Sequence, residues 1–259
     1  MIAPLLIHHF PCLDSTSLHA RREIIAGRLE SARGPVLFGA DEQTGGIGRF
    51  QRSWQSPAGG LWCTLAIPCA NAAPILPAGL GLRIGVACTQ FVRELVPHNQ
   101  RARIRLKWPN DVLLDHQKIL GALCEFLTPN PTTSRPGWLL IGVGLNANFQ
   151  IDQLPPDLHP TATTLLTSLN LTIDLNDAAN LLSTKLMATL STPALPPATL
   201  AAARDLLIGI GEQALVSLPS SERVSATFTD IDESGQAIFQ RDGARLHLNA
   251  GVLQYPEHN

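Results

Sequence analysis

Apolar positions recur along the first 146 residues in short runs typical of strands, interrupted by two segments with helical spacing. Strands are expected at the start of the chain up to Asp14 and over Val36–Ala40, Leu61–Ile67, Arg103–Lys107, Asp111–Asp115, Lys118–Leu127 and Trp138–Asn146. One helix is expected after Asp14-Ser15-Thr16, which can cap it, with Leu18, Ile24, Ile25 and Leu29 on its apolar face. A second is expected over Leu76–Val96, where Gly79, Gly81 and Gly85 permit close packing against a sheet. The pattern predicts a sheet covered by helices.

The pattern changes twice in the second half of the chain. It is helical from Thr161 to Gly209, most clearly over Asn176–Ser191, and a proline-rich connection, Thr192–Pro197, separates the last two helices. Short strands follow, over Leu215–Leu218, Val224–Asp230, Ala237–Gln240 and Leu246–Leu248, with turn residues at Asp232–Gly235 and Asp242-Gly243. This spacing is typical of small barrels. We therefore expect two domains, residues 1–209 and 210–259.

Composition narrows the possible classes of protein. The 259 residues are 45% hydrophobic and 15% charged with a net charge of −2, which predicts a folded core and no general attraction to nucleic acid or anionic membranes. Arg101, Arg103 and Arg105 alternate along one strand, which indicates a solvated face. Five cysteines without a C-x-x-C pair indicate neither a zinc site nor a disulfide framework. With no secretion signal and no apolar run long enough for a membrane span, a cytoplasmic location is expected.

The first candidate for chemistry is the polar, glycine-rich segment between the second and third strands, Asp41–Gly60. Its central part, Gln43–Trp54, contains three glycines together with Arg49 and Arg52. Glycine lets backbone amides approach an anion, and arginine neutralises phosphate or carboxylate charge. An ordinary flexible hairpin loop with solvated arginines would have the same composition. The segment lacks the sequence of a P-loop and does not open a helix as a dinucleotide fingerprint does.

Two further segments combine polar or glycine residues with strand ends. Lys107-Trp-Pro-Asn-Asp111 is followed by Lys118, so that two of the chain's three lysines flank one short strand turn. An ammonium on a flexible stem can reach a phosphate or carboxylate in a closed site, although a solvated edge charge and a rigid turn explain the residues equally well. The third segment, Ile141–Asn148, places two glycines and an amide at the end of a buried strand, which close backbone packing would also explain. Neither a histidine metal site nor a serine or cysteine nucleophile is indicated.

Taken in this order and spacing, these segments resemble the biotin protein ligases, also called biotin-[acetyl-CoA carboxylase] ligases. The likeness runs from Asp14-Ser15-Thr16 through the segment ending at Pro57 to Lys107–Asp111, Lys118-x-x-Gly121-x-x-x-Glu125 and Gly142-x-Gly144-x-Asn146. The C-terminal strands fit as well. The resemblance implies an α+β fold with a class II synthetase-like mixed sheet flanked by helices and a small C-terminal SH3-like β barrel.

The resemblance also implies a reaction in two steps. Biotin and ATP would form biotinyl-5′-adenylate and pyrophosphate, and a lysine of a biotin carboxyl carrier protein would then attack the mixed anhydride. Joining the biotin carboxylate to the α-phosphate brings two anions together, so positive charge has to be preorganised between them. Arg49 and Lys118 are the candidate catalytic residues. Mg²⁺ would bridge the phosphates, and no dedicated set of protein metal ligands is expected.

Each remaining candidate residue takes a role from the same resemblance. Biotin contacts are expected from Ser15, Thr16, Ser17, Gln43, Ile47, Gly48, Arg49, Lys118, Gly121, Gly142 and Gly144. ATP contacts are expected from Arg49, Arg52, Trp54, Lys107, Asn110, Asp111, Lys118 and Asn146. Two positions depart from the usual family loop, which has an arginine where this chain has Ile47 and a glycine where it has Gln51.

Partners and alternatives complete the expectations. Only 13 residues precede Asp14, too few for the N-terminal helix-turn-helix of the biotin-sensing repressors, so no DNA binding is expected. A homodimer is possible, because relatives pair their sheets edge to edge. The nearest alternative activity is that of a lipoate or octanoate protein ligase or transferase, and a non-catalytic biotin or nucleotide sensor is the alternative from another class.

Overall fold

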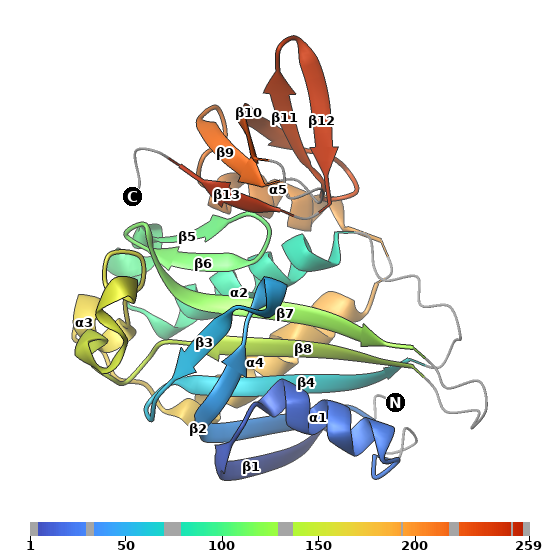
Figure 1. Ribbon diagram of the computed structural model, residues 1–259, viewed down its shortest axis with the longest axis vertical. Coiled ribbons are helices and arrows are strands. Elements are labelled where there is room, and N and C mark those ends of the chain that lie inside the picture. Colours follow the sequence, from blue (N-terminus) through green and yellow to red (C-terminus); the bar gives the residue numbers. More distant parts are fainter. Residues whose placement is uncertain are drawn as a thin grey trace. The chain divides into compact units, whose positions relative to one another are not determined.

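The computed structural model describes residues 5–29, 34–69, 79–128, 137–192, 194–217, 223–249 and 251–255. The chain divides into two compact units. Unit 1 comprises Met1–Ile75, Ile119–His159 and Thr163–Ser183, and unit 2 comprises Leu76–Lys118, Pro160–Ala162 and Thr184–Asn259. The predicted α+β class is confirmed, because each unit combines strands with helices (Figure 1).

The sheet of unit 1 is mixed, as predicted. Its strands are β1 (Leu6–Leu13), β2 (Val36–Ile47), β3 (Ser53–Ser56), β4 (Leu61–Cys69), β8 (Gly137–Leu145) and β7 (Gln117–Leu127), of which β7 begins in unit 2. The order is β1-β2-β4-β8-β7, and β3 pairs with β2. β1 runs parallel to β2, whereas the other pairs are antiparallel. The predicted strand at the start of the chain is therefore the edge strand of this sheet.

Helix α1 (Thr16–Ile25) packs on this sheet against β2, β4 and β8, and Ser15 is its N-cap (Figure 1). The predicted apolar face is wrong in two places. Ile25 is exposed, and Leu29 lies beyond the helix end. The first turn instead buries Thr16 and Ser17, because hydroxyl and amide partners inside the unit satisfy their polar groups.

The glycine-rich segment Asp41–Gly60 is more regular than its composition suggests. β2 does not end at Ala40 but continues to Ile47, and the chain returns as β3 after a single 3₁₀ turn, η2 (Arg49–Gln51). Beyond Ala40 most of the β2 side chains are exposed. A hairpin was one interpretation of this segment, but the continuation of β2 and the strand β3 were not predicted, because this part of the chain carries polar residues and glycines instead of an apolar alternation.

The remaining helical elements follow β8. They are η4 (Ile151–Gln153), η5 (Pro156–Leu158), α3 (Leu165–Leu169), α4 (Leu175–Leu190) and α5 (Pro197–Leu206). α4 confirms the predicted helix over Asn176–Ser191, and it passes from unit 1 into unit 2. In unit 2 the C-terminal end of α4 is bound by the buried Arg83, whose guanidinium donates 2.7 Å to the carbonyl oxygen of Thr192.

Unit 2 begins with helix α2 (Leu80–Leu95), η3 (His98–Arg103) and the antiparallel pair β5 (Ile104–Lys107) and β6 (Asp111–Leu114). The first residues of the predicted Leu76–Val96 helix lie outside the described residues. The predicted close packing of α2 is confirmed at Gly85, since a Cβ atom there would lie 2.3 Å from the carbonyl oxygen of Pro109. Any larger residue would push α2 away from the turn between β5 and β6.

A second sheet, entirely antiparallel, ends the chain. Its strands are β9 (Gln213–Ser217), β10 (Arg223–Ile231), β11 (Ala237–Arg241), β12 (Ala244–Leu248) and β13 (Val252–Gln254), in the order β12-β11-β10-β9-β13. The predicted turns are confirmed at Gly235, Asp242 and Gly243, which all have positive φ. β13 was not predicted, and within the described residues the order is open, without the closure of the expected barrel. Helices give way to strands between Leu206 and Gln213, and the division into domains at residue 210 stays a prediction.

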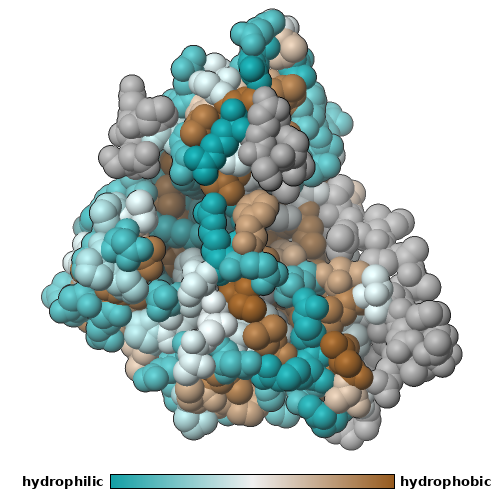
Figure 2. All heavy atoms as spheres, viewed as in Figure 1, coloured by the Kyte–Doolittle hydropathy of each residue, from teal (hydrophilic) through white to brown (hydrophobic). Residues whose placement is uncertain are grey.

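The surface mixes hydrophilic and hydrophobic residues on the face that Figure 2 shows. Among the described residues, no helix is both long enough and apolar enough to cross a membrane.

Candidate functional site

A buried network of hydrogen bonds joins the first turn of α1 to β2 and β4 in unit 1. The backbone N–H of Thr16 donates 2.8 Å to Oε1 of Gln43, and the Thr16 hydroxyl lies 3.1 Å from the same oxygen. The Gln43 amide then donates 2.8 Å to Oγ of Ser56. Thr16, Ser17 and Gln43, which were predicted to bind biotin, are therefore brought together. Their orientation is fixed before any ligand binds.

Thr64 is the centre of this network, and the sequence did not single it out. Its Oγ1 lies 2.9 Å from Oγ1 of Thr16 and 2.9 Å from Oγ of Ser17, and the residue is fully buried. A lone threonine inside the apolar run Leu61–Ile67 was the available signal, because a buried hydroxyl requires a partner. Ser56, at the end of β3, was also not among the predicted biotin-binding residues, although it lies in the glycine-rich segment.

Two glycines of β8 leave room for side chains that reach across the sheet. A Cβ atom on Gly142 would lie 2.7 Å from Oγ of Ser17, and one on Gly144 would lie 2.5 Å from Nε1 of Trp54. Gly121 of β7 is the register partner of Gly144. At Gly142 and Gly144 the strand admits only glycine, since a side chain would meet a hydroxyl group or an indole. The floor for biotin that Gly121, Gly142 and Gly144 were predicted to form stays a prediction.

The tip of the β2–β3 hairpin carries the two arginines that the sequence favoured. Arg49 is partly buried and its guanidinium carbon lies 5.7 Å from the ring centre of Phe50, whereas Arg52 is exposed. Phe50 and Gln51 have φ values of +57° and +58°. Glycine adopts this conformation without steric cost, so the usual family glycine at the Gln51 position has a physical reason. Ile47 and Gly48 lie just before the tip, at the end of β2.

Two other predicted or motif residues of unit 1 have structural partners. The buried Asn146 follows β8, and its amide donates 3.0 Å to the carbonyl oxygen of Thr163. Glu125, the last residue of the Lys118-x-x-Gly121-x-x-x-Glu125 motif, accepts from Arg21 of α1 at 2.8 Å. These contacts connect β8 and β7 to the elements around them. A nucleotide contact by Asn146 stays a prediction.

Four predicted ATP-binding residues lie in unit 2, around the turn between β5 and β6 and the start of β7. Nζ of Lys118 lies 2.7 Å from Oδ1 of Asp111, and both side chains are mostly buried. Asn110 is buried in the turn, after a cis peptide bond between Trp108 and Pro109. Lys107 ends β5, Asp111 begins β6 and Lys118 lies near the start of β7. Their role toward a nucleotide stays a prediction.

Two buried cysteines of unit 1 are poorly suited to act as nucleophiles. Burial raises the pKa of the Cys63 and Cys124 thiols to about 12, so both stay protonated at neutral pH. Near the start of α1, two hydrogen bonds from Arg22 hold the pKa of Asp14 at about 2. Among the described residues, no three His, Cys, Asp or Glu side chains gather as a metal site.

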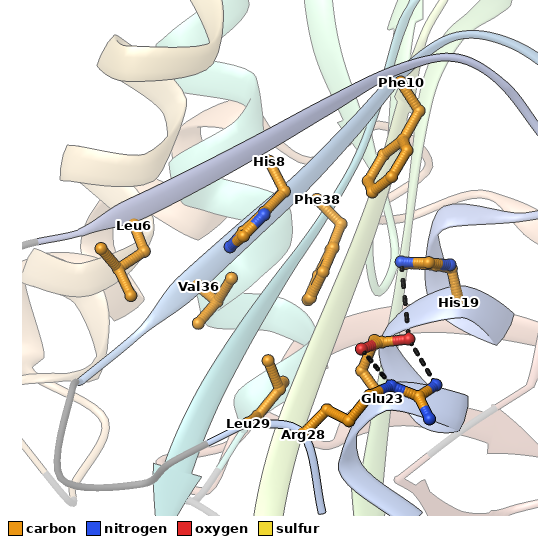
Figure 3. Close-up of a pocket in the computed structure, with 9 residues that line it drawn as sticks. All are labelled: Leu6, His8, Phe10, His19, Glu23, Arg28, Leu29, Val36 and Phe38. Atoms are coloured by element: carbon orange, nitrogen blue, oxygen red, sulfur yellow. Dashed lines mark hydrogen bonds and ion pairs between the residues drawn. The ribbon is translucent and has the colours of Figure 1, made fainter. Parts of the chain in front are cut away.

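A cavity of about 350 Å³ lies between β1, β2 and α1 of unit 1, and none of the predicted site residues lines it (Figure 3). Phe38 lies between the two imidazoles of His8 and His19, with ring centres 5.6 Å and 5.3 Å away. Glu23 accepts two hydrogen bonds from Arg28, which lower the pKa of its carboxyl group. The charged groups of this cavity are thus already compensated by each other.

Comparison with known proteins identifies the relatives of this chain. Residues 14–146 match the model of the biotin/lipoate A/B protein ligase family. The biotin--[acetyl-CoA-carboxylase] ligase of Mycobacterium tuberculosis is 30% identical over 226 residues, covering 83% of this chain and 77% of that protein. The bifunctional ligase/repressor BirA of Bacillus spizizenii is 31% identical over 131 residues, but the match spans only 50% of this chain and 38% of BirA.

Solved structures agree on the fold. The biotin protein ligase from Aquifex aeolicus in complex with biotin and ATP superposes with a TM-score of 0.72 at 21% identity, over 96% of this chain and 99% of that one. The ligase from Leishmania major in complex with biotinyl-5-AMP gives a TM-score of 0.63 at 24% identity, over 96% and 100%. The family match over half of its length and the similarity to the M. tuberculosis ligase show that the chain belongs to the biotin/lipoate A/B protein ligase family.

Proposed function

We propose that the protein attaches biotin to a lysine of a biotin carboxyl carrier protein, with ATP as the energy source and biotinyl-5′-adenylate as the intermediate. The observation that carries the proposal is the 30% identity to a biotin--[acetyl-CoA-carboxylase] ligase, sustained over 77% of that relative. The site supports the proposal, because Thr16 and Gln43 of the hydrogen-bonded network belong to the segments that resemble the family. Gly142 and Gly144, where the strand admits only glycine, belong to these segments as well.

In unit 1 the proposed task is to bind and orient biotin. Thr16 and Gln43 present hydroxyl and amide groups that the hydrogen bonds of Thr64 and Ser56 hold in place. The ureido and carboxylate groups of biotin need such fixed donors and acceptors. Arg49, at the end of the flanking hairpin, would place positive charge beside the reacting carboxylate.

In unit 2 the proposed task is to neutralise the phosphates. The Lys118 ammonium is held by Asp111, which fixes its position. Asp111 and Asn110 supply carboxylate and amide oxygens, the donor types that Mg²⁺ accepts beside phosphate oxygens, so the residues fit this ion. When bound, Mg²⁺ would stabilise charge on the phosphates.

The acceptor and the cellular setting belong to the proposal as well. The acceptor would be the carrier domain of a biotin-dependent carboxylase, as the name of the M. tuberculosis relative suggests. The expected homodimer, the absence of DNA binding and the cytoplasmic location stay predictions.

The experiment is exchange of labelled pyrophosphate into ATP, run with Mg²⁺ and with biotin, lipoate or octanoate in parallel. Exchange that requires biotin supports the proposal, and transfer of label from biotin to a purified carrier domain would complete it. Exchange with lipoate or octanoate alone would assign the protein to the other branch of the family. Absence of exchange with every acid would refute adenylate chemistry.

A further inference from the structure

Strands β2 and β3 of unit 1 meet around the side chain of Ser56, which is 5% exposed. Gln43 is its register partner, and the Gln43 amide donates 2.8 Å to Oγ of Ser56. The Ser56 hydroxyl in turn donates 3.3 Å to the carbonyl oxygen of Trp54. A Cβ atom on Gly46 would lie 2.4 Å from that carbonyl oxygen and 2.9 Å from Oγ of Ser56. Glycine at position 46 is therefore required for this contact between the two strands.

The orientation of the Gln43 amide is fixed at both of its ends. The backbone N–H of Thr16 can only donate, so the atom that it contacts at 2.8 Å has to be the side-chain oxygen of Gln43. The amide nitrogen then faces Ser56, whose single hydrogen is committed to the Trp54 carbonyl and whose oxygen accepts. Turning the amide over would place its nitrogen against the Thr16 N–H, so that two donors would face each other.

The direction of the hydroxyl groups behind Gln43 follows from this orientation, because a hydroxyl has only one hydrogen to donate. Thr16 donates its hydrogen to Gln43 at 3.1 Å, so Thr64 has to donate to Thr16 across their 2.9 Å contact. Ser17 then has to donate to Thr64, also at 2.9 Å. The hydrogen bonds therefore run in one direction, from Ser17 through the two threonines to the side-chain oxygen of Gln43.

This direction gives two groups a fixed role toward a ligand. The Gln43 oxygen already accepts two hydrogen bonds, and the second hydrogen of its amide has no acceptor among the described residues, so Gln43 can only donate. Ser17 has used its hydrogen, so its oxygen can only accept. A cyclic urea matches both roles, because its carbonyl accepts and its N–H groups donate, whereas an alkyl chain or a disulfide ring matches neither.

We propose that Ser56 is a specificity-determining residue that acts through Gln43, because it holds the amide donor in place for the carbonyl of the biotin ureido ring. The inference deepens the proposed function and rests on it for the identity of the ligand. Without the Ser56 oxygen, the Gln43 side chain is held only at its carbonyl end. Ser56 itself need not touch biotin, and it is a positioning residue in this sense.

The test measures the dissociation constants of biotin and of iminobiotin, in which an imino group replaces the ureido oxygen, by competition calorimetry. Loss of one neutral hydrogen bond predicts biotin binding weaker by about 2- to 10-fold in Ser56→Ala. Iminobiotin should be affected less, because it lacks the carbonyl oxygen that uses the donor held by Ser56. The ratio of the two dissociation constants should therefore change, whereas general damage to the fold would weaken both ligands equally.

A double-mutant cycle tests whether Ser56 acts through Gln43. Gln43→Met keeps the length of the side chain and removes the amide, so Ser56→Ala should have no further effect on biotin binding in this background. Ser53→Ala is the matched control, since it makes the same chemical change at an exposed position of β3, where the hydroxyl accepts from Gln55 at 3.3 Å. This control should leave both dissociation constants unchanged.

Equal effects of Ser56→Ala in the wild-type and Gln43→Met backgrounds, or equal losses of affinity for biotin and iminobiotin, would overturn the inference. Its failure is distinguishable from failure of the proposed function. A wild-type protein without biotin-dependent pyrophosphate exchange refutes the function, whereas normal exchange with unaltered biotin binding in Ser56→Ala refutes only the role of Ser56.

Discussion

Replacing Thr64 with valine should disconnect the network that orients the predicted biotin-binding groups. Valine has nearly the same shape as threonine, so β4 and its buried neighbours keep their packing, while both 2.9 Å contacts to Thr16 and Ser17 are lost. At roughly 0.5–1.5 kcal/mol for each hydrogen bond, the free energy of unfolding should fall by about 1–3 kcal/mol. For a chain of this size each kcal/mol lowers the Tm by about 2–4 °C.

The functional effect of Thr64→Val should be confined to biotin. Once the Thr16 hydroxyl lacks its second partner, it can rotate away from Gln43, so the KM for biotin should rise while the KM for ATP stays near the wild-type value. Both constants come from pyrophosphate exchange at varied biotin and varied ATP, and differential scanning calorimetry gives the Tm.

Thr64→Ser is the matched control, because it keeps the hydroxyl and removes one methyl group worth about 0.8 kcal/mol. This variant should be somewhat less stable than the wild type but should retain the wild-type KM for biotin. The reasoning would be refuted if serine and valine raised that KM equally, or if valine left it unchanged.

Three other perturbations follow from contacts described above. Gly144→Ala places a Cβ atom 2.5 Å from the Trp54 indole and should lower the free energy of unfolding by about 1–3 kcal/mol. Gly48→Ala should lower it less, because the Cβ atom there would lie 3.5 Å from its nearest neighbour. Thermal unfolding that ranks the two variants the other way would contradict this. The lowered pKa of Asp14 gives a stabilisation that is present above its ordinary pKa and is lost as the pH falls from about 4 to 2. Because the ion pair between Asp14 and Arg22 is exposed, Asp14→Asn should remove less than about 1 kcal/mol of this pH dependence of stability, measured by urea titration. An unchanged pH dependence would count against this contribution of Asp14. Arg49→Gly should release adenylate, because it removes a charged hydrogen bond worth roughly 1.5–3 kcal/mol. Biotinylation of bystander lysines should therefore rise by about tenfold or more. Mass spectrometry that shows unchanged labelling of these lysines would exclude a role of Arg49 in retaining the adenylate.

The sequence predicted the sheet strands of unit 1 well, because long apolar runs such as Leu61–Ile67 and Trp138–Asn146 have few alternatives to burial in a sheet. It failed where a strand leaves the core. The outer half of β2 has no apolar alternation, and its regularity comes from backbone pairing with β3, which a single-residue pattern does not encode. β13 was missed because three residues are too short for any period to emerge.

The candidate site shows the same division. Residues recognisable by type and spacing, such as Arg49, Lys118 and the β8 glycines, were found. Thr64 was not, because a threonine among apolar residues is common in strands, and its importance depends on two hydroxyl groups that arrive from a helix 47 and 48 positions earlier.

The left-handed backbone of Phe50 and Gln51 places backbone strain at the tip of the β2–β3 hairpin. Each such residue costs about 1–2 kcal/mol relative to an ordinary conformation, so the tip lies above the relaxed state of the same chain by an amount comparable to one or two charged hydrogen bonds. A chain with glycine at position 51 would carry less of this strain, because glycine adopts the left-handed conformation without steric cost.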